Sequence, residues 1–218
     1  LLSAALLICS AGCSSEITIT TDSSGNAEIV YTSEMGSAFN ALAGSVLKLS
    51  DNGTGSTADT AAQLFNASDI QNWLTRQKMQ NAQCTAGKNG SLSVSGLFSM
   101  HDGFLSDPEL ITLKKDGKKN TVTVKLSPET LASLIENMPD EMQSYSDLLM
   151  APVFTGETMA KTEYTQLIAS VYGADAASEL EKSAIRLTLS AGRTSKTFTL
   201  PLVDLLTLTQ EKIFSITW

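Results

Sequence analysis

Pairs of short strand patterns, each joined by a polar turn, alternate along this 218-residue chain with stripes of apolar residues at helical spacing. The first pair is typical: residues 16–20 and 27–31 alternate apolar and polar side chains, and residues 22–26 between them read Asp-Ser-Ser-Gly-Asn. Alternation with period two around a polar, glycine-containing segment predicts a β-hairpin. The same pattern predicts strand pairs at 82–86 with 91–98, at 110–113 with 122–126 and at 185–189 with 198–200, and a last strand over 214–218.

The segments between these pairs carry apolar residues at the i, i+3, i+4 spacing of helices with one buried face. Ser68, with Gln71 three residues on, is predicted to cap one helix. Ser127 before Pro128 is predicted to cap another. The predicted stripes are Phe39–Leu47, Ile70–Leu74, Leu131–Met138, Met142–Leu149, Tyr164–Tyr172 and a short helix over residues 176–181. We therefore predict the α+β class, an antiparallel sheet built from hairpins with amphipathic helices packed on one face.

Residues 1–13, LLSAALLICSAGC, are an apolar run that ends in small residues and a cysteine. The run is too short for a bilayer of about 30 Å, which takes roughly 20 residues, and it has the character of a secretory signal. Ser10-Ala11-Gly12-Cys13 resembles the lipobox of bacterial lipoproteins, with the looser pattern of spirochaetes because Ser10 replaces the usual Leu. The resemblance implies cleavage before Cys13 and acylation of Cys13 with diacylglycerol and a fatty acid such as palmitate. An ordinary secretory signal, which would leave Cys13 a free thiol, is the alternative.

This interpretation makes residues 1–12 a truncated signal peptide and residues 13–218 a single extracytoplasmic α+β domain, anchored in the bacterial cell envelope. Cys9 leaves with the signal and Cys13 is acylated, so Cys84 is the only free cysteine and no disulfide framework is expected. A composition of 42% hydrophobic and 17% charged residues is that of a globular domain. The formal net charge of −8 opposes phosphate backbones and anionic lipid surfaces, so no nucleic-acid partner is expected.

One motif pair suggests a serine enzyme. Ser45-Val46-Leu47-Lys48 matches the S-x-x-K of penicillin-binding proteins and serine β-lactamases, and Ser50-Asp51-Asn52 matches their S-D-N. In that family the motifs come from distant parts of the chain, whereas here they overlap one helix end, and no K-T-G occurs. We interpret Ser45 and Lys48 as polar helix residues without essential chemistry.

The only histidine, His101, precedes Asp102, but the chain has no G-x-S-x-G elbow to supply a nucleophile. We interpret this pair as a turn between strands. With one histidine and one remaining cysteine, a zinc site of the usual ligand set is not expected within one chain.

Three acidic or irregular segments receive structural interpretations. Residues 51–59 lack the D-x-D-x-D-G pattern and terminal Glu of a calcium loop. Asp140 and Glu141 suit the first turn of a helix, where the macrodipole favours negative charge. Residues 155–157 are interpreted as a linker. No catalytic residue, metal ligand or cofactor is therefore predicted.

The leading hypothesis is a non-enzymatic, lipid-anchored envelope protein that binds or scaffolds. Its partners would be the membrane, through acyl chains on Cys13, and an apolar ligand or an envelope protein. The opening hairpin, helix and further strands are loosely similar to LppM-type bacterial lipoproteins, and that similarity implies an apolar cavity for lipid. The alternative is a carboxylate-dependent hydrolase of the cell envelope, which needs two Asp or Glu residues facing each other in a pocket.

Overall fold

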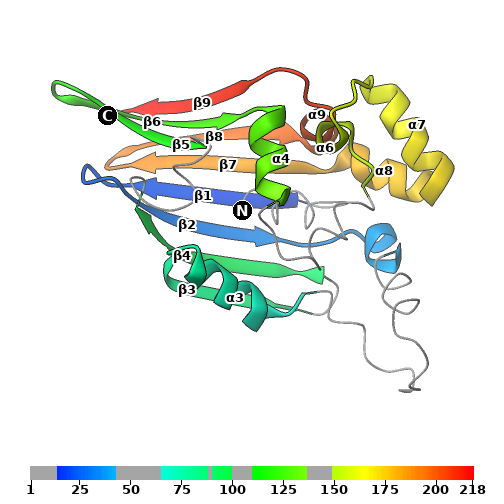
Figure 1. Ribbon diagram of the computed structural model, residues 1–218, viewed down its shortest axis with the longest axis horizontal. Coiled ribbons are helices and arrows are strands. Elements are labelled where there is room, and N and C mark those ends of the chain that lie inside the picture. Colours follow the sequence, from blue (N-terminus) through cyan, green and yellow to red (C-terminus); the bar gives the residue numbers. More distant parts are fainter. Residues whose placement is uncertain (1–13, 43–64, 88–89, 100–109, 137–148) are drawn as a thin grey trace.

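The computed structural model describes residues 14–42, 65–87, 90–99, 110–136 and 149–218 (Figure 1). These residues form an α+β structure with two sheets, the larger with strand order β3-β4-β2-β1-β7-β8 and the smaller with order β5-β6-β9. The larger sheet consists of β1 (Ser14–Thr21), β2 (Asn26–Ser33), β3 (Gln80–Ala86), β4 (Leu92–Ser99), β7 (Ala184–Ala191) and β8 (Thr194–Pro201). The smaller sheet consists of β5 (Ile111–Asp116), β6 (Lys119–Leu126) and β9 (Lys212–Thr217).

All four predicted hairpins are confirmed, because each depends on local turn chemistry. In the β1–β2 turn, Asp22 Oδ1 accepts hydrogen bonds from the backbone N–H groups of Ser24 at 2.8 Å and Asn26 at 2.9 Å. The Asn26 amide also donates to Asp22 Oδ2 at 2.8 Å, and these bonds lower the pKa of Asp22. The side chain of Asp22 thus fixes the turn that sets the register of the first two strands.

The prediction of an antiparallel sheet is wrong at one position, because β1 pairs with β7 in parallel. Ile17 lies opposite Leu187 in this pair and opposite Tyr31 in the antiparallel β1–β2 pair. Parallel neighbours cannot be joined by a tight turn, so this contact joins segments far apart in the sequence, which a hairpin pattern does not reveal.

A second difference from the prediction is the smaller sheet, which covers part of one face of the larger sheet (Figure 1). Phe198 of β8 and Phe214 of β9 meet edge to face with ring centroids 5.1 Å apart. Buried residues of β1 and β7 pack towards this layer, among them Ile19 and Leu189. Two sheets, and not one sheet covered only by helices, therefore enclose this part of the core.

The opposite face of the larger sheet carries mostly polar side chains that are exposed or half-buried, with Val30 and Leu97 as exposed apolar residues among them, and we call it the open face. Its side chains form ranks across the sheet because the strand registers align them. The ranks are Thr85, Ser93, Thr32, Glu16, Arg186, Thr199; Gln83, Ser95, Val30, Thr18, Thr188, Thr197; and Leu97, Glu28, Thr20, Ser190, Ser195. Hydroxyls pair across strands in two of them, Thr188 with Thr197 and Ser190 with Ser195, each at 2.9 Å.

The helices are α3 (Ala67–Arg76), α4 (Pro128–Glu136), α6 (Pro152–Thr155), α7 (Lys161–Tyr172), α8 (Ala174–Lys182) and α9 (Leu202–Leu206), together with a helical segment at 37–42. Helix α3 buries Ile70, Trp73 and Leu74 as predicted and lies beside β3. Its cap differs from the prediction, because Asn66 Oδ1, and not Ser68, accepts the N–H groups of Ser68 and Asp69.

The predicted cap of α4 is confirmed. Ser127 Oγ accepts the N–H of Thr130 at 3.2 Å, and Thr130 Oγ1 accepts the N–H of Ser127 at 2.7 Å. Leu131 of this helix is buried, while the side chains of residues 134–138 and 142–145 lie outside the described residues.

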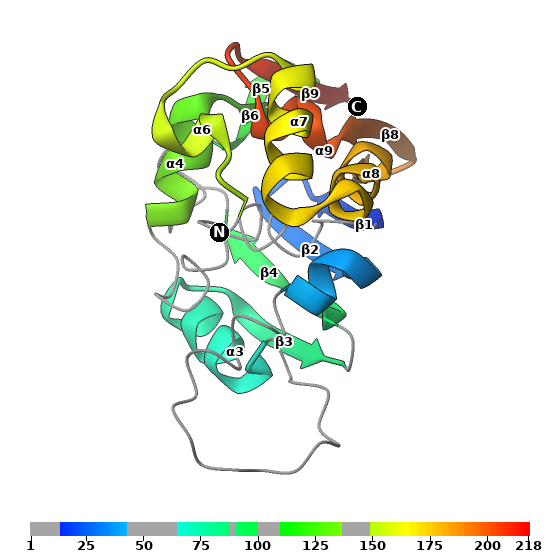
Figure 2. The same cartoon turned by 90° about the vertical axis from the view of Figure 1, so that its right-hand side faces the viewer.

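Helix α7 does not pack on a sheet face as the sequence predicted. It contacts α8 and α9 beyond the ends of the strands (Figures 1 and 2). Tyr164 and Ile168 are fully buried there, whereas Val171, from the same predicted stripe, is 51% exposed. The stripe correctly predicted a helix with a buried side, but its periodicity contains no information about which element covers that side.

The helical segment at 37–42 is fastened to α8 by a carboxylate. Glu179 Oε1 accepts from Ser37 Oγ at 2.9 Å and from the N–H of Ala38 at 2.8 Å, and Glu179 Oε2 accepts from the N–H of Phe39 at 3.3 Å. A carboxylate distant in the sequence thus satisfies N–H groups that the first turn of a helix leaves free. In the part of the chain described, we find no helix with the length and apolarity needed to cross a membrane.

Candidate functional site

Most residues that the sequence singled out lie outside the described residues. They are Cys9, Cys13, Ser45, Lys48, Ser50, Asp51, Asn52, His101, Asp102, Asp140 and Glu141. Acylation of Cys13, and the absence of essential chemistry at Ser45, Lys48 and His101, therefore remain predictions. The sequence interpreted residues 155–157 as a linker. In the structure, α6 ends at Thr155, and Gly156 follows it with a left-handed φ of 74°.

Cys84 is the one singled-out cysteine within the described residues. It lies on β3, is buried, and forms no disulfide. Burial raises the pKa of its thiol to about 11, so the thiol stays protonated near neutral pH. A protonated, buried thiol is a packing group and a poor nucleophile.

A polar groove with a volume of about 480 Å³ lies at one end of the open face. It lies where β1 begins and β2 ends, beside the end of β3 and the start of β4. Its lining residues are Glu16, Thr32, Ser33, Glu34, Thr85, Ala86, Gly87, Ser91, Leu92 and Ser93. This volume is within the range of small-molecule sites, and seven of the ten lining residues carry a hydroxyl or a carboxylate.

Four of these side chains form one straight rank across four neighbouring strands. Glu16 pairs with Thr32, Thr32 with Ser93, and Ser93 with Thr85. At about 4.8 Å between strands, the rank is about 14 Å long. The groove therefore presents a row of hydrogen-bonding groups whose length suits an extended ligand.

Arg186 of β7 continues this rank and forms an ion pair with Glu16, with 3.2 Å between Nη1 and Oε1. Both side chains are more than half exposed, so the pair contributes little to stability. Its effect on the groove is to orient Glu16 and offset its charge. Glu34 is the remaining carboxylate of the groove and is exposed.

Two buried hydroxyls at this end of the sheet have no hydrogen-bond partner among the described residues. Ser15 and Ser33 lie opposite each other in the β1–β2 register, and their exposed fractions are 0% and 3%. Buried polar groups without partners are uncommon and costly. Ser33 is among the residues that line the groove, but its side chain lies on the buried face of β2, opposite to that of Thr32.

A second hollow lies between the two sheets and is apolar. It is bounded by strands of both sheets, by Leu131 of α4 and by Leu205 of α9, and its volume is only about 40 Å³. Ligand sites occupy roughly 300–1,000 Å³. The space left between the described residues is thus far smaller than the lipid cavity expected from the LppM resemblance.

The groove residues were not identified in the sequence. Each is an ordinary polar residue of an alternating strand, and only the register between strands places Glu16, Thr32, Ser93 and Thr85 in line. Among the residues whose positions are described, no three His, Cys, Asp or Glu side chains are close enough to hold a metal ion. The arrangement offers hydrogen-bond donors, acceptors and negative charge to a polar ligand.

Comparison with known proteins finds no matching family model, no matching curated protein and no matching solved structure.

Proposed function

We propose that this chain is a lipid-anchored bacterial envelope protein, with Cys13 as the acylated residue, whose domain binds a polyhydroxylated ligand in the polar groove. An envelope glycan is the favoured ligand class. The observation that carries the proposal is the rank Glu16–Thr32–Ser93–Thr85 along a groove of about 480 Å³. Sugar hydroxyls both donate and accept hydrogen bonds, and serine, threonine and glutamate side chains match them.

The lining of the groove supports a polar ligand over an apolar one, because its hydroxyl and carboxylate side chains can exchange hydrogen bonds with ligand hydroxyls. An apolar ligand in the groove would instead leave the hydroxyls and carboxylates of the lining without partners, which costs free energy.

The proposed anchor is close to the groove in the chain. Strand β1 begins at Ser14, and a peptide bond separates the Cα atoms of adjacent residues by about 3.8 Å. Glu16 of the groove is three residues from Cys13. Acylation of Cys13 would hold this end of the sheet at the membrane surface, because no spacer separates the anchor from the strand.

The second candidate is the carboxylate-dependent hydrolase, since Glu16 and Glu34 line the same groove. A glycosidase needs one carboxyl group to act as a general acid, usually in a desolvated position. Both glutamates are exposed and Glu16 is paired with Arg186, so the surroundings favour binding over hydrolysis.

The test is co-sedimentation of the full chain with isolated cell-wall glycan. Thr32→Val removes a hydroxyl from the groove and Glu34→Gln replaces a carboxylate by a neutral amide, and each should weaken binding roughly 2–10-fold, the value of one hydrogen bond. Thr20→Val and Glu28→Gln are the matched controls, because both residues lie on the same open face outside the groove. Equal losses in groove and control variants, or no binding by the unsubstituted chain, would refute the groove as the site. Release of soluble sugar that Glu34→Gln abolishes would favour the hydrolase.

A further inference from the structure

The end of the molecule opposite α7 and α8 carries a cluster of cations that we call the basic tip. It consists of Lys114, Lys115, Lys118 and Lys119 on the β5–β6 hairpin, Arg193 and Lys196 on β8 and its preceding turn, and Trp218. All six cations are exposed. They stand out in a chain whose net charge is −8.

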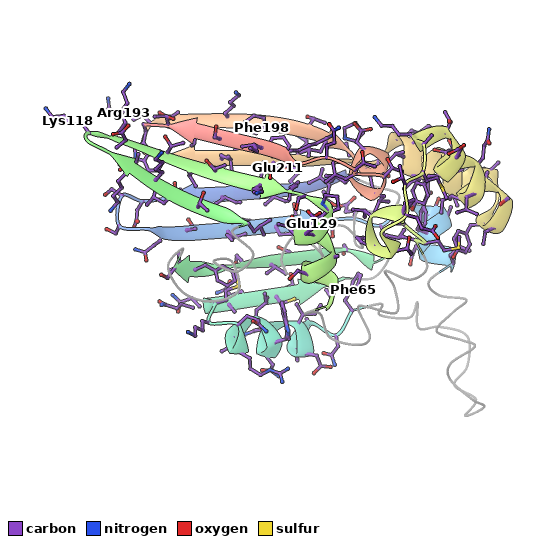
Figure 3. The ribbon with its side chains drawn as sticks, turned by 45° about the horizontal axis from the view of Figure 1, so that its top comes forward. Phe65, Lys118, Glu129, Arg193, Phe198 and Glu211 are labelled. Atoms are coloured by element: carbon purple, nitrogen blue, oxygen red, sulfur yellow. The ribbon has the colours of Figure 1, made fainter. Side chains whose placement is uncertain are left out.

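The two parts of the basic tip are joined through Trp218. Its backbone N–H donates to Asn120 O at 3.0 Å and its carbonyl accepts from Asn120 N at 2.9 Å, which ties it to the hairpin. Its ring atom Cδ1 lies 4.0 Å from the position that a Cβ on Gly192 would occupy, so the ring also covers the β7–β8 turn. Figure 3 shows Lys118 and Arg193 projecting outward at the same end of the molecule.

The cations of the basic tip have no ion-pair partner among the described residues. The ion pairs found among the described residues involve other cations, namely Lys125, Lys161, Arg186 and Lys212. Asp116 is the only acid among residues 114–119, and Asp22, on the β1–β2 turn, also stays negatively charged because hydrogen bonds within its turn lower its pKa. The six cations outnumber these two acids. Lys196 has a different contact, with Nζ 4.8 Å from the centre of the Phe198 ring.

The negative charges of α8 lie too far away to cancel this patch. Helix α8 lies one length of β7 from the β7–β8 turn, about 26 Å for eight residues, whereas charges in physiological salt are screened over about 8 Å. A partner that approaches the basic tip therefore experiences a locally positive surface.

We propose that the basic tip is a docking surface for an anionic lipid membrane. The cations lie in or beside two turns, Gly117-Lys118 and Gly192-Arg193, and these turns form a projecting end of the molecule that suits a broad surface (Figure 1). Half-buried Trp218 adds an amphipathic ring of the kind that sits at membrane interfaces. A nucleic acid, the competing polyanion, is bound best along a groove lined by cations and stacked aromatic rings. Strand β1 begins at the opposite end of the sheet, since Ser14 pairs with Ala184 and Thr21 with Ala191, so acylated Cys13 and the basic tip would engage two facing membrane surfaces. The proposal does not depend on acylation of Cys13.

The test measures binding of the full chain, with Cys13→Ser to prevent acylation, to vesicles of phosphatidylcholine alone or with about one third phosphatidylglycerol. The tip variant Lys118→Gln with Arg193→Gln is compared with Arg76→Gln plus Lys182→Gln, which changes the net charge equally on α3 and α8. We expect binding only to the phosphatidylglycerol vesicles, weaker at high salt, reduced roughly 30-fold in the tip variant and unchanged in the control. Trp218 emission should shift to shorter wavelength on binding, and Trp218→Phe should remove the shift.

Equal binding to both vesicles, or equal loss in the tip and control variants, would overturn the proposal. Tighter binding of a DNA oligonucleotide than of anionic vesicles, with the same loss in the tip variant, would assign the basic tip to nucleic acid and overturn it as well.

Discussion

The hydroxyl of Tyr164 provides a specific test of how the helical end is held together. Tyr164 is fully buried on α7, and its hydroxyl donates a hydrogen bond of 2.6 Å to the carbonyl oxygen of Leu149. Tyr164→Phe keeps the ring and its packing but leaves that carbonyl without this donor. An unsatisfied buried acceptor costs about 1–3 kcal/mol. For a chain of this size, each kcal/mol lowers the melting temperature by about 2–4 °C.

Thermal and urea unfolding of Tyr164→Phe and Tyr172→Phe would measure this cost. Tyr172 is on the same helix and half-buried, so its variant should lose less than about 0.5 kcal/mol. Equal stability of the two variants would refute the hydrogen bond as a fastening of α7 to Leu149.

Tyr164 also predicts a change of stability at alkaline pH. Burial, with a smaller contribution from Tyr172, raises the pKa of Tyr164 well above its ordinary value near 10. The folded state therefore favours the neutral phenol, and the stability from this group is complete below about pH 10 and falls as the pH rises further. Tyr164→Phe should lose less stability than the unsubstituted chain between neutral pH and about pH 11, and an identical decline in both proteins would contradict this reasoning.

Three further predictions concern single side chains. Cys84 should resist alkylation at about pH 8 in the folded protein and react rapidly in denaturant, because burial raises its pKa to about 11; fast labelling of the native protein would contradict its buried position. Glu179→Ala should destabilise the protein by about 0.5–2 kcal/mol and speed amide exchange at residues 37–42, and unchanged exchange there would show that the cap is unimportant. Burial acts to raise the pKa of Asp204, but its contacts with Lys161 at 2.7 Å and Lys212 at 3.4 Å outweigh this effect and hold the pKa below its ordinary value. The stabilising effect of Asp204 is therefore present at neutral pH and lost as the pH falls below about 4. Asp204→Asn should flatten the acid side of the stability curve, and an unaltered curve would contradict the ion-pair assignment.

Sequence pattern predicted those elements that local chemistry determines. The β1–β2 hairpin follows from the hydrogen bonds of Asp22, and the start of α4 follows from Ser127 before Pro128, since each signal lies within a few residues of its effect. The cap of α3 was misassigned because Asn66 and Ser68 are both good capping residues, and only the backbone conformation of Asn66 distinguishes them.

Contacts between distant segments could not be predicted in this way. The parallel pairing of β1 with β7 and the position of α7 beside α8 depend on packing, and an apolar stripe is the same whatever covers it. The groove was missed for a related reason. Glu16 and Thr85 are unremarkable in sequence, and only the pairing through β2 and β4 places them in one rank.

The most direct test of the groove as the binding site is amide chemical-shift mapping of the ¹⁵N-labelled chain during titration with soluble cell-wall glycan fragments. We expect concentration-dependent shifts at the groove rank Glu16–Thr32–Ser93–Thr85 and at Ser33, with amides around Val124 and Leu187 of the apolar hollow unaffected. Shifts centred on the apolar hollow, or the absence of shifts at the groove, would contradict the account.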